Sequence, residues 1–310
     1  GEIVAGGSAN LHSQGALVNS GVIAAGDTLA IQAEQITQEG GHLQAEQLAL
    51  KAKQAIAMSD ESTVLATDSA ELSAGTNLSL ADTQIQTLNK LQLQAGQKIA
   101  MQDTDLQSQQ GDVSLDAKSI VQANTTLGGK NLALSASDNI QAEDSQWLAD
   151  STLQATSDVL NLHRLSSAAE QIKLQANQGL KHHDSVMVAE QSVHLQAAAM
   201  TNQGGQIAAG ENLQINAGQL LDNQEGALVA QQDLQITASI VTNQQGKLSA
   251  QQDLQVTASQ SVNNQSGLMV ADGALLLSSP IVINKGGQIS AANLLAINNN
   301  TSFDNQSGLL

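Results

Sequence analysis

Apolar and polar residues alternate in short stretches along this chain, as in the segment Leu234-Gln-Ile236-Thr-Ala238. A period of two residues is typical of a β-strand, because successive side chains point to opposite faces of a sheet. The Ala, Leu and Gln of these stretches favour a helix by propensity, but a helix would place its apolar residues three and four positions apart. We therefore predict short strands that turn one face inward.

The alternating stretch recurs at a nearly constant interval in the C-terminal third of the chain. An Asn returns every 20 or 21 residues, at Asn202, Asn223, Asn243, Asn264, Asn284 and Asn305. A Gly follows three residues after each Asn, at Gly205, Gly226, Gly246, Gly267, Gly287 and Gly308. Self-similarity of this kind is the signature of a repeat protein, in which copies bury their apolar faces against one another.

An apolar anchor of the form Leu-x-Leu-x-Ala extends the repeat into the rest of the chain. It occurs at Leu29, Leu48, Leu91, Val113, Leu132, Ile172 and Val193, with weaker anchors at Ala70 and Ser151. The middle of the chain keeps the anchor but loses the Asn and most of the Gly. We therefore predict a single array over residues 1–310, with regular repeats at 1–52, irregular repeats at 53–198 and regular Asn/Gly repeats at 199–310.

Stacked copies of this length predict an all-β fold. We expect a right-handed parallel β-helix of about 14–15 coils, each of roughly 20–21 residues with three short strands. The Asn column is expected at a turn, with its amides hydrogen-bonded from coil to coil, and the Gly column is expected to supply positive φ angles. A leucine-rich repeat has a similar period but needs Asn three residues after the second Leu of its strand. Those places hold Gly218, Ser239, Ser259 and Pro280.

Composition and charge exclude several partner classes. The formal net charge is −18, and the eleven Lys and Arg residues are scattered, so nucleic acid and anionic membrane surfaces are not expected partners. No apolar stretch is long enough to predict membrane insertion. The chain has no Cys, which excludes a disulfide framework, and its N-terminus lacks the pattern of a signal peptide. Because the repeat starts and stops in mid-pattern, we expect a part of a longer protein.

Candidate chemistry in this chain is sparse. The one histidine cluster is His182-His183-Asp184, whose rings should diverge if the segment is a strand, and we expect an exposed turn there. Acidic pairs such as Asp103/Asp105 could attract calcium, but solvated turn carboxylates are the simpler interpretation. An enzyme acting on acidic polysaccharides would need aromatic platforms, and the only aromatic residues are Trp147 and Phe303. We predict no enzyme activity, no cofactor and no metal site.

The irregular repeats at 53–198 are the candidate place for a partner, because binding surfaces of solenoids come from departures from the repeat. Trp147 and Arg164 are the candidate contact residues within this segment. The alternative interpretation is a second subtype of repeat with looser turns and no binding role.

The repeat from Asn223 to Ala238, read as Asn-x-x-Gly-x-Leu-x-Ala-x-x-x-Leu-x-Ile-x-Ala, resembles the haemagglutinin repeat of the filamentous haemagglutinin family. That family includes large exoproteins of Gram-negative two-partner secretion, both adhesins and effectors of contact-dependent growth inhibition. The resemblance is specific over residues 199–310, fair over 10–52 and general between them.

The resemblance implies a filament or stalk outside the cell, as a non-enzymatic segment of a secreted cell-surface exoprotein. It also implies export through an outer-membrane two-partner transporter, flanking parts of the same chain as neighbours, and a target-cell receptor as a candidate partner. Adhesin and growth-inhibition effector stay open, because neither the secretion domain nor a toxin domain of the family is present in this sequence. The alternative is a receptor- or glycan-binding module that uses residues 53–198.

Overall fold

Two compact units make up the chain. The computed structural model describes residues 1–310 and contains only β-strands, bends and turns. The first unit is Gly1–Ser157 and the second is Asp158–Leu310. The predicted sub-regions at 1–52, 53–198 and 199–310 follow the repeat pattern rather than this division, and they stay a prediction. No segment forms a helix with the length and apolar character needed to span a membrane.

The strands of the first unit are short at its beginning and longer toward its end. They are β1 (Glu2–Ala5), β2 (Ala9–His12), β3 (Ala16–Asn19), β4 (Val22–Ala25), β5 (Thr28–Ala33), β6 (Gln35–Glu39), β7 (His42–Ala52), β8 (Ile56–Ser59), β9 (Ser62–Ala74), β10 (Asn77–Thr87), β11 (Lys90–Ala95), β12 (Lys98–Ser108) and β13 (Asp112–Glu143). Strand β14 (Gln146–His163) contains the boundary between the units.

The second unit has long strands first and short strands toward its end. They are β15 (Ser166–His183), β16 (Val186–Thr201), β17 (Gln206–Ala209), β18 (Leu213–Asp222), β19 (Ala227–Ala230), β20 (Leu234–Thr242), β21 (Lys247–Ala250), β22 (Leu254–Asn263), β23 (Leu268–Ala271), β24 (Ala274–Ser278), β25 (Ile281–Ile283), β26 (Gln288–Ala291), β27 (Leu294–Asn298) and β28 (Ser302–Asp304).

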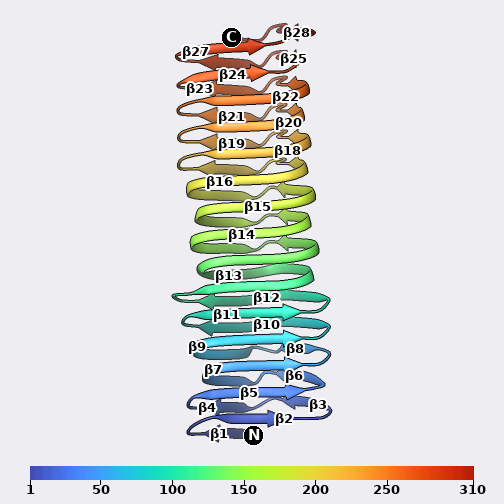
Figure 1. The fold of residues 1–310 in the computed structure, drawn as a ribbon, viewed down its shortest axis with the longest axis vertical. Coiled ribbons are helices and arrows are strands. Elements are labelled where there is room, and N and C mark those ends of the chain that lie inside the picture. The colour runs from blue at the N-terminus through green and yellow to red at the C-terminus, as the bar shows by residue number, and fades with distance from the viewer. The chain divides into compact units, whose positions relative to one another are not determined.

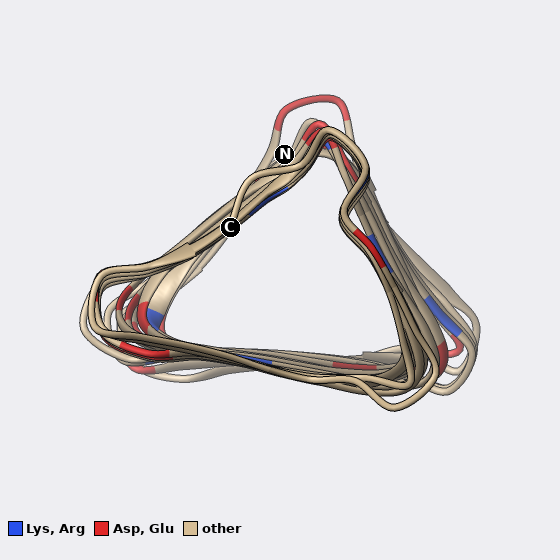
Figure 2. Ribbon diagram, turned by 90° about the horizontal axis from the view of Figure 1, so that it is seen from above, with Lys and Arg blue, Asp and Glu red and all other residues tan.

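Successive coils pair in parallel and in register, so the chain is a β-solenoid of about 15 turns. Leu213 pairs with Leu234, and Leu234 pairs with Leu254, so each apolar anchor lies on the anchor of the next coil. Seen along the coils, the backbone follows a three-sided path (Figure 2). The near strands, such as β5 and β11, run to the right as the chain climbs, which is the right-handed sense (Figure 1). The predicted parallel β-helix is confirmed.

The predicted three strands per coil are present in the first coils, as β1 to β3, and in the last coils, as β26 to β28, but not between them. Each coil has three segments: one after the Gly, one with the Leu-x-Ile-x-Ala anchor, and one that ends before the next Asn. In most coils of the second unit the second and third segments form one bent strand, as in β20, because the parallel pairing resumes after a register shift at Ala238/Ile240. The segments separate only near the C-terminus, as β24 and β25. Pro280 lies between those two strands, and it has no N–H to donate to the ladder.

Coil length varies at this bend. The coil from Leu213 to its partner Leu234 has 21 residues, and the register shift in it skips two residues, Gly218 and Gln219. The coil from Leu234 to Leu254 has 20 residues, and its shift skips only Ser239. The extra residue of a longer coil is therefore accommodated where the second segment turns into the third.

The core consists of stacked aliphatic side chains and Ala. Anchors such as Leu213, Leu234 and Leu254 have no exposed surface, and burying each aliphatic side chain stabilises the fold by about 1.5–3 kcal/mol. The weak anchor Ala70 is confirmed, since it pairs with Leu91. The anchor predicted at Ser151 is wrong by two residues. Leu153, at 1% exposed, is the buried residue of that coil, because a Leu fills the interior that a Ser cannot.

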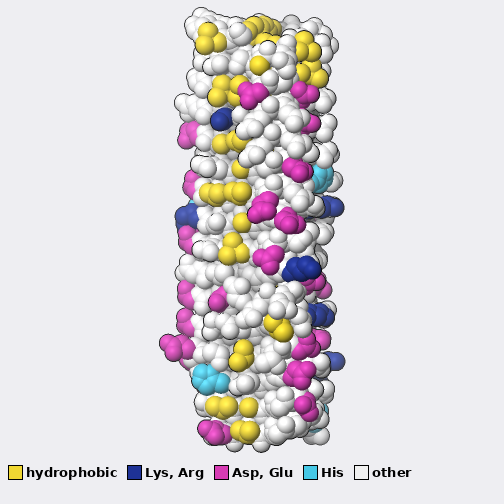
Figure 3. All heavy atoms as spheres, turned by 90° about the vertical axis from the view of Figure 1, so that its left-hand side faces the viewer, with side chains coloured by type: hydrophobic (Ala, Val, Ile, Leu, Met, Phe, Trp, Pro, Cys, Tyr) yellow, Lys and Arg dark blue, Asp and Glu magenta, His cyan; other side chains and the backbone are white.

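Charged residues stay outside this core. Asp and Glu gather mainly at the corners of the three-sided path (Figure 2). On the side shown in Figure 3, hydrophobic side chains reach the surface in small groups with carboxylates beside them. The exposed hydrophobic residues include Leu65 and Leu148 in the first unit and Val186 and Val188 in the second.

Candidate functional site

The Asn residues of the C-terminal repeats form a continuous ladder of side-chain amides inside the coil. Each Nδ2 donates a hydrogen bond to the Oδ1 of the Asn one coil later, for example from Asn223 to Asn243 at 2.7 Å. The other four links, which start at Asn202, Asn243, Asn264 and Asn284, measure 2.7–2.8 Å. Each Nδ2 also donates to the carbonyl of the Gly three residues later, as Asn223 does to Gly226 at 3.1 Å. The predicted amide ladder is thus present in the structure.

The position of the ladder differs from the prediction. Asn202, Asn223, Asn243, Asn264 and Asn284 have no exposed surface and point into the core, whereas we expected them in a left-handed turn conformation. Positive φ occurs two residues later, at Glu225, Gln245, Ser266 and Ser307 and at Gly204 and Gly286. The amides can be buried because each one is hydrogen-bonded on both sides, and this offsets the cost of removing them from water.

The Gly column also has a different role from the one predicted. None of its six members has a positive φ. A Cβ atom built on Gly226 would overlap the carbonyl oxygen of Asn202 and approach Oδ1 of Asn223 to 2.6 Å. Gly is therefore required because the ladder and the backbone of the previous coil occupy the space of its side chain, and not because of its backbone angles.

The ladder position can be followed through the remaining coils by counting two residues on from the aliphatic residue of the third segment. In the second unit this position holds Leu162 and then His182 ahead of Asn202, and in the first unit it holds Asn19, Gln38, Met58, Leu80, Met101, Gln122 and Ala142. We call this set, together with the six Asn residues, the ladder column. Its apolar members are buried, so the middle of the chain replaces amides by ordinary packing.

A corner with one positive-φ residue per coil runs through the irregular repeats, and it was not predicted from the sequence. The corner residues with positive φ are Asp82, Asp103, Asn124, Asp144, Arg164 and Asp184, at intervals of 20 or 21. A Thr or Ser follows most of them, and its buried hydroxyl donates to the carbonyl two residues back, as Thr104 does to Gln102 at 2.9 Å. The same column continues at Gly204, Glu225 and Gln245, so the irregular repeats and the Asn/Gly repeats share this corner. The available signal was an Asp or Asn before a Thr or Ser at the repeat interval.

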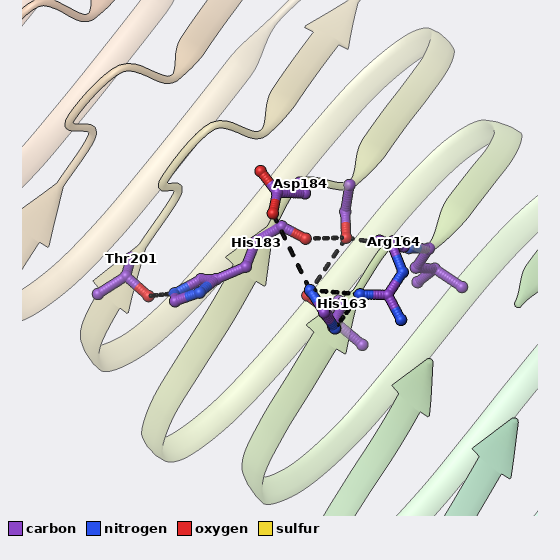
Figure 4. A network of polar contacts seen from close by, with 8 residues as sticks. His163, Arg164, His183, Asp184 and Thr201 are labelled. Atoms are coloured by element: carbon purple, nitrogen blue, oxygen red, sulfur yellow. Dashed lines mark hydrogen bonds and ion pairs between the residues drawn. The ribbon is translucent and has the colours of Figure 1, made fainter. Parts of the chain in front are cut away.

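One corner of the second unit carries a polar cluster at the surface. Arg164 Nη1 lies 2.9 Å from His163 Nε2, and that nitrogen lies 3.9 Å from an Asp184 carboxylate oxygen (Figure 4). His183 points the other way, and its Nε2 lies 3.0 Å from Thr201 Oγ1 (Figure 4). The side chains of His163 and Asp184 are 42% and 68% exposed. The cluster thus presents a guanidinium, an imidazole ring and a carboxylate to solvent. Arg164 stays a predicted partner contact.

The histidine cluster of the sequence is divided between the inside and the outside. The predicted divergence of the rings is correct, because His182 is fully buried while His183 reaches the surface. The expectation of an exposed turn is wrong for His182, whose Nδ1 lies 2.7 Å from Asn202 Oδ1 at the start of the ladder. Burial lowers the pKa of His182 to about 4, against the weaker opposing effect of its hydrogen bond to Asn202.

Trp147 does not lie where a partner contact requires it. Its side chain has no exposed surface, and its Nε1 donates a hydrogen bond of 2.7 Å to Gln122 Oε1 inside the coil. The structure therefore does not support a partner contact at Trp147. An indole buries more apolar area than any other side chain when its N–H finds an acceptor, which explains why it fills the core here.

The acidic corner of the first unit lines a groove formed by Asp82, Asp103, Asp105 and neighbouring hydroxyl groups. Two of these carboxylates accept hydrogen bonds from the protein, Asp103 from Asn124 at 3.0 Å and Asp105 from Gln107 at 2.8 Å. No group of three or more His, Asp or Glu residues is arranged to hold a metal ion. The simplest description of these carboxylates is a solvated corner.

Comparison with known proteins identifies the C-terminal part of the chain. Residues 212–310 match the haemagglutinin repeat family. No curated protein and no solved structure matches the chain. The matched segment contains the ladder from Asn223 to Asn305, so the resemblance predicted from the Asn and Gly columns is confirmed. Residues 212–310, about a third of the chain, are thus similar to the haemagglutinin repeat.

Proposed function

We propose that this chain is a non-enzymatic filament or stalk segment of a large secreted exoprotein on the surface of a Gram-negative bacterium. The observation that carries the proposal is the in-register parallel stacking of the matched repeats around one internal amide ladder. In such an array each coil contacts only its neighbours, so length is added without a change in cross-section.

The ladder suits a mechanical role of this kind. Each coil of residues 202–305 is joined to the next by backbone hydrogen bonds and by a side-chain amide bond in the core. A slip of one residue would turn Asn to the outer face, bring a neighbour such as Asp222 or Gln224 inside and break the amide bonds of the ladder, which is costly. The ladder therefore favours a single register, as an extended support requires.

The similarity to the haemagglutinin repeat supports a proposal for the setting of the stalk. The chain would pass through an outer-membrane two-partner transporter during secretion and continue into flanking parts of the same protein. It would hold an adhesive or toxic module away from the cell, so adhesion and contact-dependent growth inhibition are two forms of one proposal. A target-cell receptor would be contacted by that distal module.

Removal of whole coils tests the stalk proposal. Deletion of residues 213–274 removes three coils, because Leu213 is replaced in register by Leu275. We expect a folded protein whose longest dimension in small-angle scattering is shorter by about 14 Å, at roughly 4.8 Å per coil. Deletion of residues 213–222, about half a coil, is the matched control and should unfold the neighbouring repeats. Scattering from a compact globule, or an unchanged dimension after the three-coil deletion, would contradict the proposal.

A receptor- or glycan-binding module at residues 53–198 is the second candidate. The exposed cluster of His163, Arg164 and Asp184 favours it, because an exposed guanidinium can donate charge-assisted hydrogen bonds to an acidic group of a ligand (Figure 4). Binding of the purified chain to target cells should then fall at least tenfold in Arg164→Ala and stay unchanged in Lys173→Ala, a control at another exposed cation. Equal binding by both variants would rule out this surface.

A further inference from the structure

The amide ladder has a direction, and this direction defines its first member. Every Asn in it donates Nδ2 toward the C-terminus and accepts at Oδ1 from the N-terminal side. Asn202 Nδ2 donates to Asn223 and to the Gly205 carbonyl, so its Oδ1 is the acceptor end of the ladder. That buried oxygen needs a donor from the preceding coil.

His182 occupies the donor position. It lies in β15, in the ladder column, and its Nδ1 is 2.7 Å from Asn202 Oδ1. Since an amide oxygen can only accept, the Nδ1 atom must carry the hydrogen, which leaves Nε2 as the bare nitrogen of a neutral ring. Nε2 is buried without a hydrogen-bond partner. The site therefore accommodates the neutral ring in one tautomer, and Gly205 closes over Nδ1 with no room for a side chain.

A second proton on this ring would have no acceptor. It would add an N–H and a positive charge at Nε2, in a place where no polar group is available to receive them. The charge of His183, whose ring lies outside, acts on His182 and disfavours protonation further, and His182 forms no ion pair. The other charged or titratable residues on the adjoining parts of β14, β15 and β16 and at the corner are Asp158, His163, Arg164, Glu170, Lys173, Lys181, Asp184, Glu190 and His194, and none of them is buried.

We propose that His182 is an acid-sensitive latch, whose protonation releases the first member of the amide ladder and opens the junction between the β15 coil and the β16 coil. Two backbone hydrogen bonds close this junction beside the latch, from the Asp184 N–H to the Gln203 carbonyl at 3.1 Å and from the Gln206 N–H to the Ser185 carbonyl at 2.9 Å. The open form takes up a proton that the closed form rejects, so acid shifts the population toward the open form. An acidic compartment or surface would then loosen the array at the boundary between its ladder repeats and its apolar repeats.

Hydrogen exchange of the 1–310 chain tests the latch. Opening at the amides of Asp184 and Gln206, corrected for intrinsic exchange rates, should rise about tenfold per pH unit below about pH 6.5 and level off below pH 4 near a 300-fold increase. In His182→Gln the pH dependence should disappear, because a Gln amide donates to Asn202 Oδ1 without titrating, and Gln is the natural residue of the ladder column at Gln38 and Gln122.

The matched control is His183→Gln, which removes the neighbouring surface ring and should keep the wild-type pH dependence. A second measurement needs no variant, since the nuclear magnetic resonance signal of the His182 ring in the intact chain should titrate well below the signals of the exposed His rings. Opening that is independent of pH in the wild type, an unchanged pH slope in His182→Gln, or a His182 ring that titrates near 6.5 would each overturn the latch.

Discussion

Asn243→Ala interrupts the amide ladder in its middle and tests how much the ladder contributes to stability. The Asn243 side chain accepts a hydrogen bond from Asn223 Nδ2 and donates one to Asn264 Oδ1, each at 2.7 Å. Its Nδ2 also donates to the carbonyls of Gly246 at 3.2 Å and Leu268 at 3.1 Å. The substitution removes all four contacts and leaves Asn264 Oδ1 buried without its donor.

The expected loss follows from these contacts. Two strong hydrogen bonds at roughly 1 kcal/mol each, together with about 1–3 kcal/mol for an orphaned buried oxygen, lower the free energy of unfolding by about 3–5 kcal/mol. Asn305 stands at the end of the ladder, is only partly buried, and has contacts with Asn284 and Gly308 alone. Because water can replace those contacts, Asn305→Ala should cost about 1 kcal/mol.

The measurement has to be local, because a repeat array does not unfold as a single two-state unit. Hydrogen exchange of the amides in β20 and β22 reports the opening of the coils that contain Asn243 and Asn264. Thr237→Ala, an exposed substitution in the same coil, should leave this exchange unchanged. If Asn243→Ala and Asn305→Ala cost the same, or if Asn243→Ala changes exchange no more than Thr237→Ala does, the ladder is not a source of stability.

Three further predictions concern single positions. The unfolded chain binds a proton on His182 below pH 6.5, and the folded chain does so only near pH 4. The free energy of opening of the coils around His182, measured by hydrogen exchange in β15 and β16, is therefore highest above pH 6.5 and falls by about 3 kcal/mol as the pH drops to 4. Gly246→Ala should lower the free energy of local opening by about 1–3 kcal/mol, measured by hydrogen exchange of the β19 and β21 amides, because its Cβ would overlap the Asn223 carbonyl. Gly218→Ala, where the nearest atom is 3.9 Å away, should be neutral, and a comparable loss there would refute the steric argument. Trp147→Ala should lower the free energy of local opening by about 3–5 kcal/mol, measured by hydrogen exchange of the β14 amides, and unchanged exchange would contradict its burial.

Much of the fold could be predicted from the sequence because one periodicity acts on every coil. The alternation in Leu234-Gln-Ile236 placed both aliphatic residues inside, where the structure has them fully buried. Extending the same alternation from Val241 by two residues would also have placed Asn243 inside. The polarity of Asn favoured a turn instead, and polarity is a poor guide where identical amides in adjacent coils can hydrogen-bond one another.

The candidate site was harder to predict, because its residues differ from coil to coil. Trp147 drew attention as a rare aromatic, although the alternation Trp147-x-Ala149 indicated an inward side chain. The donor role of His182 depends on its being 20 residues before Asn202, which is visible only once the coil register is known. The corner residues from Asp82 to Asp184 share a backbone conformation rather than a side chain, so no single letter of the sequence marks them.

The bend at Gly218 and Gln219 has a consequence for how such a chain can evolve. It accommodates 20- and 21-residue coils while the ladder and the aliphatic anchors keep their register. Added residues at this bend project outward and leave the pairing on either side intact, whereas added residues between an Asn and the Gly that follows it would disrupt the core. The bend is therefore the place where a loop or a small domain can be inserted, so that new surface features can be acquired on an unchanged scaffold.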